Sequence, residues 1–157
     1  MSVTWAELVR QLGGDALELA AAGWPVLPCN GKVPVCRGGH LGGSTDLAQV
    51  EQWWTEHPDA NIGARVPDNM AGIDVDPRNG GHETLAELEE RYGPLPVTLT
   101  VKTGGHELGR HFYFQRPPGP LSNGSDKLGS GIDVKLGGKG LLILPPSRHP
   151  ETFRRYE

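Results

Sequence analysis

The stretch Ile73-Asp74-Val75-Asp76 is the most informative part of the sequence, because apolar and acidic residues alternate in it. Side chains at positions i and i+2 of a β-strand lie on the same face of the sheet. We therefore expect Asp74 and Asp76 to project together, while Ile73 and Val75 enter the core. Neighbouring carboxylates repel each other unless a proton or cation lies between them, and hard oxygen ligands suit Mg²⁺ or Mn²⁺. The stretch predicts a strand of a sheet with a candidate metal site, although an acidic strand end before Pro77 is also ordinary turn chemistry.

A second acidic strand follows near the C-terminus, in Ile132-Asp133-Val134-Lys135. The same alternation puts Asp133 and Lys135 on one face of that strand. The pair fits two interpretations. It is either an exposed ion pair worth less than about 1 kcal/mol, or a third metal ligand beside a phosphate contact.

A glycine-rich loop precedes the strand that contains His111. Thr103-Gly104-Gly105 comes after one predicted strand, and glycines allow backbone N–H groups to approach an anion such as a phosphate. In the next strand Phe112 and Phe114 have the character of core residues, so His111 and Tyr113 face the other side. Histidine can donate a hydrogen bond to a triphosphate or bind a metal. A plain hairpin with an incidental histidine is the alternative.

The rest of the pattern predicts three helices and about seven strands. The helices are expected at residues 2–22 (interrupted at Gly13-Gly14), 47–57 and 82–92, and the strands at 24–28, 61–66, 71–76, 98–103, 111–115, 132–136 and 141–144. Prolines place strand 24–28 near a sheet edge, residues 29–43 form a loop, and strands 61–66 and 71–76 are candidates for a hairpin. Helices gather early and strands late, which favours an α+β fold with a largely antiparallel or mixed sheet.

Composition limits the classes of protein to which the chain can belong. The chain has 157 residues, the size of one domain, and a formal net charge of -4, which does not by itself indicate a nucleic-acid-binding protein. It lacks a membrane-length apolar run and a signal-peptide pattern, so we expect a cytoplasmic location and no membrane partner. Basic side chains at Lys32, Lys102, Arg110, Lys127, Lys135, Lys139, Arg148, Arg154 and Arg155 are candidates for a rim that contacts template DNA.

The two cysteines are too few for a disulfide scaffold. Cys29, Cys36 and His40 could bind zinc only with a fourth ligand, such as His57 or His106. Their spacing is not that of common zinc fingers. Ordinary free thiols are the other interpretation, and the sequence leaves the two open.

Taken in order, six segments resemble the bifunctional DNA primase-polymerase N-terminal family, part of the archaeo-eukaryotic primase superfamily. They are residues 23–34, 45–63, 74–76, 103–114, 131–135 and 145–149. The resemblance extends from about residue 16 to the end of the chain. One departure is the stretch 106–109, which is longer than the family's usual gap between the glycines and the histidine.

The resemblance implies an archaeo-eukaryotic primase-type fold, with an RRM-like mixed or antiparallel sheet flanked by helices. It also implies the site: Asp74, Asp76 and Asp133 hold two Mg²⁺ or Mn²⁺ ions, His111 is catalytic, and the nucleotide contacts are Thr103, Gly104, Gly105, Arg110, His111 and Lys135. The implied activity is template-directed nucleotidyl transfer, as a DNA primase, a DNA polymerase or both. Its partners would be a DNA template and primer with dNTPs or NTPs.

The resemblance further implies a place in the replication of a plasmid, phage or other mobile element. We expect residues 1–157 to form one catalytic domain at the N-terminal end of a longer protein, with a helicase domain as a candidate partner beyond residue 157. Two other classes stay open. One is an inactive primase-like domain that binds nucleotide or DNA, and the other is a metal-dependent nuclease or phosphohydrolase that uses the same acids.

Overall fold

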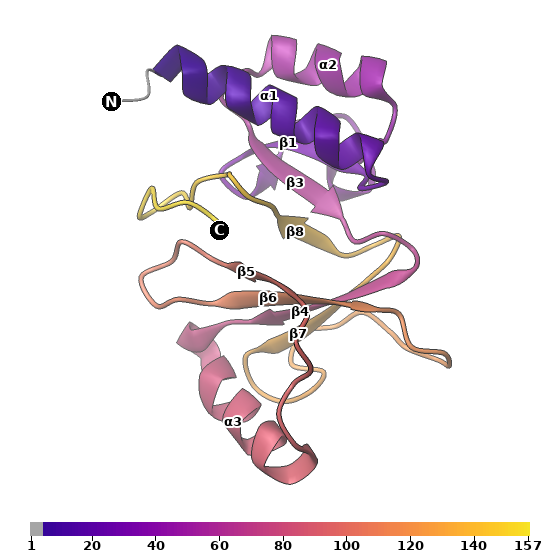
Figure 1. Ribbon diagram of the computed structural model, residues 1–157, viewed down its shortest axis with the longest axis vertical. Helices are drawn as coiled ribbons and strands as arrows, with labels where there is room; N and C mark the ends of the chain where they lie inside the picture. Colours follow the sequence, from indigo (N-terminus) through magenta and orange to yellow (C-terminus); the bar gives the residue numbers. More distant parts are fainter. Residues whose placement is uncertain (1–4) are drawn as a thin grey trace.

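Two four-stranded sheets lie face to face in the middle of the molecule, in a computed structural model that describes residues 5–157 (Figure 1). Helices α1 and α2 cover the outer face of one sheet, and α3 covers the outer face of the other. All the strand pairs within the two sheets are antiparallel. This arrangement confirms the predicted α+β fold of the primase type, with antiparallel sheets between helices.

The first sheet is built mainly from the N-terminal half of the chain and has the strand order β2-β1-β3-β8. Its strands are β1 (Val26–Asn30), β2 (Val33–Pro34), β3 (Asn61–Arg65) and β8 (Leu141–Ile143). Its outer face is covered by α1 (Trp5–Ala21) and α2 (Leu47–Glu56), which bury Ala16, Ala20, Val50 and Trp54. Helix α2 begins where the Asp46 carboxylate accepts hydrogen bonds from the N–H groups of Ala48 and Gln49.

Two details of this sheet differ from the prediction. Helix α1 runs unbroken through Gly13 and Gly14, and Gly13 lies where α1 meets α2: a Cβ there would be 3.4 Å from the Cβ of Trp54, an ordinary van der Waals distance. The predicted start of the helix at residues 2–4 lies outside the described residues. Strand β1 is not an edge strand, because residues 33–34, which we predicted as loop, fold back beside it as β2.

The second sheet contains the strand with the two acids and has the order β5-β6-β4-β7. Its strands are β4 (Met70–Val75), β5 (Leu99–Lys102), β6 (Arg110–Gln115) and β7 (Ile132–Leu136). Helix α3 (Gly81–Tyr92) leads from β4 to β5 across the outer face, where Leu85 and Leu88 pack against Val75, Phe112 and Ile132. A strand order of this kind with a helical crossover is that of RRM-like split β-α-β units.

The predicted hairpin between residues 61–66 and 71–76 is wrong. Strand β3 pairs with β1 and β8, whereas β4 pairs with β6 and β7, so the chain changes sheets between them. The crossing is held by a second crossing that runs beside it from β7 to β8: the Val66 N–H donates to the Gly140 carbonyl at 2.9 Å, and the Gly138 N–H donates to the Val66 carbonyl at 3.3 Å. Residues close in sequence therefore belong to different sheets.

The inner faces of the two sheets share one apolar core. Leu142 from the first sheet belongs to the same buried cluster as Val101 and Tyr113 from the second, and a Cβ on Gly72 of β4 would be 2.9 Å from the Cδ1 atom of Leu142. After β8 the C-terminal segment returns to the edge of the second sheet, where Lys102 and Glu157 exchange backbone hydrogen bonds of 2.7 and 3.1 Å. Among the described helices, none combines the length and the apolar character that crossing a membrane requires.

Candidate active site

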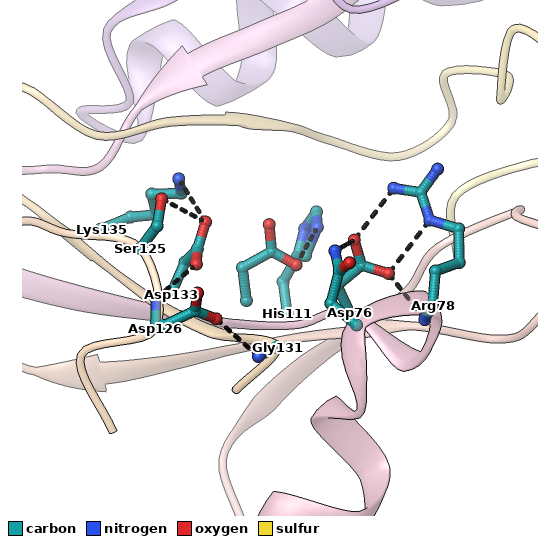
Figure 2. A network of polar contacts seen from close by, with 10 residues as sticks. Asp76, Arg78, His111, Ser125, Asp126, Gly131, Asp133 and Lys135 are labelled. Atoms are coloured by element: carbon teal, nitrogen blue, oxygen red, sulfur yellow. Dashed lines mark hydrogen bonds and ion pairs between the residues drawn. The ribbon is translucent and has the colours of Figure 1, made fainter. Parts of the chain in front are cut away.

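A row of three chemically active side chains crosses the inner face of the second sheet. Asp74 in β4 is directly opposite His111 in β6 on one side and Asp133 in β7 on the other. Residues opposite one another in adjacent strands point to the same face. Asp76 follows on the same strand, just beyond the end of β4. Figure 2 shows His111, Asp133 and Asp76 on one side of the sheet, so the structure brings together the three acids and the histidine singled out in the sequence.

Two glycines fix the end of β4 where Asp76 lies. The Asp76 N–H donates to the Gly131 carbonyl at 2.8 Å, and the Gly81 N–H donates to the Asp76 carbonyl at 2.9 Å. A Cβ on Gly81 would lie 2.6 Å from both of these carbonyl oxygens, and Gly131 has a φ of 75°. Only glycine fits such contacts and such a φ without strain. The start of α3, the start of β7 and the end of β4 therefore meet in one place.

Asp74 is the acid in the middle of the row and lies next to a neutral histidine. Its Oδ1 is 3.6 Å from Nε2 of His111. Burial, with smaller contributions from the nearby Lys32 and Lys135, lowers the pKa of His111 to about 3, so the ring is uncharged at neutral pH. The pKa of Asp74 is raised to about 6: burial is the main cause, Asp133 and Asp76 add to the rise, and Lys135 and Lys32 oppose it. The central carboxylate therefore binds a proton more tightly than an ordinary aspartate, and a nearby cation would stabilise its ionised form.

Asp76 has a different environment, with hydrogen-bond donors on both oxygens. Oδ1 accepts from the Arg78 backbone N–H at 3.0 Å and from Nε of Arg78 at 3.1 Å. Oδ2 accepts from Nη2 of Arg78 at 2.9 Å and from Nδ2 of Asn79 at 3.1 Å. The side-chain hydrogen bond from Arg78 is the main reason that the pKa of Asp76 lies below its ordinary value.

Asp133, at the other end of the row, also has a cation of its own. The Lys135 Nζ is 3.1 Å from Oδ2 of Asp133, and the Asp126 backbone N–H donates to Oδ1 at 3.1 Å. Asp126 adopts a left-handed φ of 52°, and its carboxylate accepts a hydrogen bond from the Gly131 N–H at 2.7 Å. The loop before β7 is therefore folded around Asp133 (Figure 2).

The donor set suits hard divalent cations, which prefer carboxylate oxygens. Three carboxylates share one face, and burial raises the pKa of Asp74, whose carboxylate has no lysine or arginine within ion-pair distance among the described residues. As the side chains stand, no group of three His, Cys, Asp or Glu residues in the described part of the chain is close enough to enclose a metal ion. The chemistry fits a metal site, and the side chains of Asp76 and Asp133 must leave their present partners to complete it.

The predicted nucleotide-binding residues fall into two groups. Thr103, Gly105 and His111 line a cavity beside Asp74 and Asp76. Gly104 instead packs against the C-terminal segment, since a Cβ there would be 2.4 Å from the Arg154 carbonyl oxygen. The lengthened loop closes on itself, with the Thr103 N–H donating to the Gly109 carbonyl at 2.9 Å.

Arg110 is on the wrong side of the sheet for contact with this cavity. Its guanidinium lies 5.9 Å from the centre of the Phe112 ring, in a groove lined by residues of α3 such as His82 and Leu85. Lys135 is on the inner face, but at the Asp133 end of the row. Of the two cations predicted to contact phosphates, the structure places only Lys135 on the face of the acids.

Sequence reasoning gave no site role to several residues that line the cavity. Lys32, which we predicted only for a DNA-binding rim, Arg78, His149, Glu151 and Tyr156 all contribute to its wall. The Tyr156 ring is 6.0 Å from that of His111 and 6.3 Å from that of His149, so the three rings form a column. The proximity of Arg78 to Asp76 in the sequence was the one available signal.

Two buried polar side chains hold the C-terminal wall of the cavity in place. The Ser147 hydroxyl accepts a hydrogen bond of 2.7 Å from the Ile62 N–H in β3. The Asn61 amide donates to the carbonyls of Gly31 and Arg148 and accepts from the Arg148 N–H. Through these bonds the first sheet positions His149 and Lys32 opposite the acidic row.

The zinc interpretation of Cys29, Cys36 and His40 finds no support. Both cysteines are free thiols, and burial raises the pKa of Cys29 to about 12 and also raises the pKa of Cys36. The described residues include no cluster of metal ligands around His40.

Comparison with known proteins identifies the family of the chain. No curated protein is significantly similar to the chain. Residues 16–157 match the family described as bifunctional DNA primase/polymerase, N-terminal, which covers the whole of both sheets and every residue of the site. The chain therefore belongs to the Prim-Pol family and is a domain of the DNA primase/polymerase type.

Proposed function

We propose that this domain catalyses template-directed nucleotidyl transfer, with two divalent cations held by Asp74, Asp76 and Asp133. The observation that supports this most directly is the cross-strand row in which Asp74 has Asp133 as its direct neighbour. Membership of the Prim-Pol family supports nucleotidyl transfer in general. In the reaction the 3′ oxygen of a primer would bond to the α-phosphorus of a nucleotide, and pyrophosphate would leave.

The metals supply one part of the chemistry. When bound, divalent cations would favour ionisation of the 3′-hydroxyl and neutralise negative charge on the triphosphate. The chain supplies the ligands and their spacing. Asp74, with a pKa of about 6 and without a lysine or arginine within ion-pair distance among the described residues, is the carboxylate most ready to accept a cation.

The wall of the cavity would bind the phosphates. Thr103 and Gly105 line the cavity, and Lys32 contributes a positive charge that acts on both Asp74 and His111. A cation and a glycine-containing loop beside a carboxylate-rich face suit a triphosphate. Lys135 would contact the negative charge of the triphosphate from the Asp133 end of the row.

His111 would act as a neutral hydrogen-bonding group. Its side chain is only 6% exposed, and its Nδ1 atom has no partner in the described structure. A buried ring nitrogen without a partner is uncommon unless a ligand satisfies it. With one ring nitrogen toward Asp74 and the other free, the imidazole can orient a phosphate oxygen or the Asp74 carboxylate.

A primer-extension assay tests the proposal. A labelled primer on a DNA template is incubated with dNTPs or NTPs, in Mg²⁺ or Mn²⁺, with the wild type and with the control variant Asp59→Ala, whose side chain is exposed in the turn after α2. We expect template-dependent lengthening of the primer by both proteins and none in EDTA. Shortening of the primer would instead identify a nuclease. Binding without any metal-dependent change in length would identify an inactive domain.

A further inference from the structure

Both carboxylate oxygens of Asp76 accept hydrogen bonds, mainly from Arg78. Four donors, three of them from Arg78 and one from Asn79, fill both oxygens of the Asp76 carboxylate at 2.9–3.1 Å. The guanidinium contributes two of these bonds in the fork arrangement that matches a carboxylate. A carboxylate engaged in this way has little capacity left for a cation, so a metal ligand from Asp76 requires that Arg78 move.

The Arg78 side chain is free to move because it is mostly in solvent. It is 59% exposed, compared with 26% for that of Asp76. Such partly exposed ion pairs contribute little stability. Its backbone, by contrast, is fixed in the short helix Pro77–Asn79, which is capped by the Asp76 side chain itself. The guanidinium can therefore swing while its Cα stays beside the site.

The alternative position for Arg78 lies within the same cavity. Arg78 lines the cavity together with Lys32, His149 and Gly105. The cavity has a volume of about 80 Å³, far below the roughly 300–1,000 Å³ of ordinary ligand pockets. The cavity therefore has room for only part of a nucleotide, and a guanidinium released from Asp76 at its wall is well suited to bidentate contact with a phosphate.

We propose that Arg78 alternates between two partners: it holds Asp76 in the metal-free protein, and it binds a phosphate of the incoming nucleotide once a divalent cation engages Asp76. The proposal rests on the metal site of the proposed function. It makes the binding of metal and of nucleotide mutually favourable. A metal that binds Asp76 frees Arg78 for the phosphate, and a phosphate that binds Arg78 frees Asp76 for the metal. Arg78 is then a positioning residue for the metal and a direct ligand of the nucleotide.

Two binding measurements on purified protein test this. Calorimetry gives the affinity for Mn²⁺ alone, and then the affinity for a non-hydrolysable dNTP at saturating Mn²⁺. For Arg78→Gln we expect Mn²⁺ alone to bind about three- to fivefold more tightly, because Asp76 is released from an exposed ion pair. The nucleotide is expected to bind about tenfold more weakly, because a charge-assisted contact is lost.

Matched variants separate the two positions of Arg78. Asn79→Ala removes a donor to Asp76 but no phosphate ligand, so it should tighten Mn²⁺ binding slightly and leave nucleotide affinity unchanged. Arg91→Gln removes an arginine at the end of α3, whose guanidinium lies 5.4 Å from the centre of the Tyr92 ring, and should change neither affinity. Arg78→Lys keeps the charge without the fork and should lie between the wild type and Arg78→Gln.

The outcomes discriminate clearly. Opposite changes in the two affinities for Arg78→Gln support the proposal. A metal affinity that is unchanged or weaker, or a nucleotide affinity that is unchanged, overturns it; if Arg78→Gln fails to fold, the same criteria apply to Arg78→Lys. A wild type that shows both affinities but extends no primer contradicts the proposed function and leaves the role of Arg78 intact. A wild type that extends primers while Arg78→Gln shows no opposite changes contradicts only the role of Arg78.

Discussion

The two sheets have the same number of strands but opposite characters. On the first sheet, the buried side chains of Asn61 and Ser147 have hydrogen-bond partners that join strand β3 to the C-terminal segment. One buried donor of this sheet, Nε of Arg65 in β3, has no partner among the described residues, although the two other guanidinium nitrogens of Arg65 donate to carbonyls. On the inner face of the second sheet, His111 Nδ1 and the Tyr113 hydroxyl are buried without a partner in the described structure, next to the half-buried Asp74. Polar groups left unsatisfied lower stability and mark functional sites. We infer that the first sheet mainly contributes stability. In the second sheet, the unsatisfied polar groups beside Asp74 lower stability at the candidate active site.

The largest effect that this comparison predicts is on activity and comes from the second sheet. Asp74→Ala removes the central carboxylate of the row, and we expect the rate of primer extension to fall by about 10³-fold, since the removed group would hold a metal in the transition state. Melting temperature and far-UV circular dichroism should show a folded protein. A folded Asp74→Ala variant that extends primers normally would remove Asp74 from the site.

The second predicted effect is that replacing Asp74 by asparagine increases folding stability at high pH. Because the pKa of Asp74 is raised from 3.8 to about 6, the folded state binds this proton more tightly than the unfolded state. The ionised form therefore costs stability above pH 6, by at most about 3 kcal/mol. Asp74→Asn should recover part of that cost in metal-free urea unfolding at pH 8 and lose the gain as the pH falls from 6 towards 4. A variant less stable than the wild type at pH 8 would contradict this.

His111 opposes Asp74 over the same range of pH. Its pKa is lowered to about 3, so the unfolded state binds the proton more tightly and folding stability decreases as the pH falls below the ordinary value of 6.5. In the wild type the two contributions partly cancel between pH 4 and 6. In Asp74→Asn only the histidine contribution remains, so stability measured across this range should depend more steeply on pH than in the wild type.

The third effect concerns the junction that places Asp76. Gly81→Ala would bring a Cβ to 2.6 Å from the carbonyl oxygens of Asp76 and Gly131, and we expect a loss of about 2 kcal/mol in unfolding free energy. Gly14→Ala is the control: a Cβ there meets no atom within 4 Å, and alanine is the better helix former by about 1 kcal/mol. Equal stability of the two variants, measured by urea unfolding, would show that the junction is not tightly packed.

Much of the second sheet could be predicted from the sequence because its strands alternate regularly. Strand β7 has the predicted limits, α3 begins one residue before its predicted start, and Asp133 and Lys135 lie on the same face of β7, as the period of two requires. The same period places Arg110 and His111, which are consecutive in β6, on opposite faces of the sheet. The predicted contact of both residues with one nucleotide therefore conflicted with the alternation of their own strand. Local pattern is reliable where one face of a strand is buried.

What could not be predicted depends on contacts between distant segments. The short loop 66–69 looks like a hairpin, and only the pairing of Val66 with Gly138 and Gly140 shows that it crosses between sheets. The direction of the Asp76 side chain is set by the short helix that follows β4, where alternation no longer applies. Tertiary packing likewise determines the ion pair between Arg78 and Asp76. It also brings together the rings of His111, Tyr156 and His149.

The smallest effect is expected on the first sheet, where it should appear in stability rather than in chemistry. Ser147→Ala leaves the buried Ile62 N–H without its acceptor, which costs about 1–2 kcal/mol. The rate of extension per folded molecule should change much less than for Asp74→Ala, because Ser147 is fully buried and outside the cavity that contains the acids. A matched pair of urea and extension measurements on both variants would test the division of labour between the sheets. If Ser147→Ala reduced the rate as strongly as Asp74→Ala while remaining folded, the first sheet would have to position His149 and Lys32 for the reaction far more tightly than its role as a frame requires.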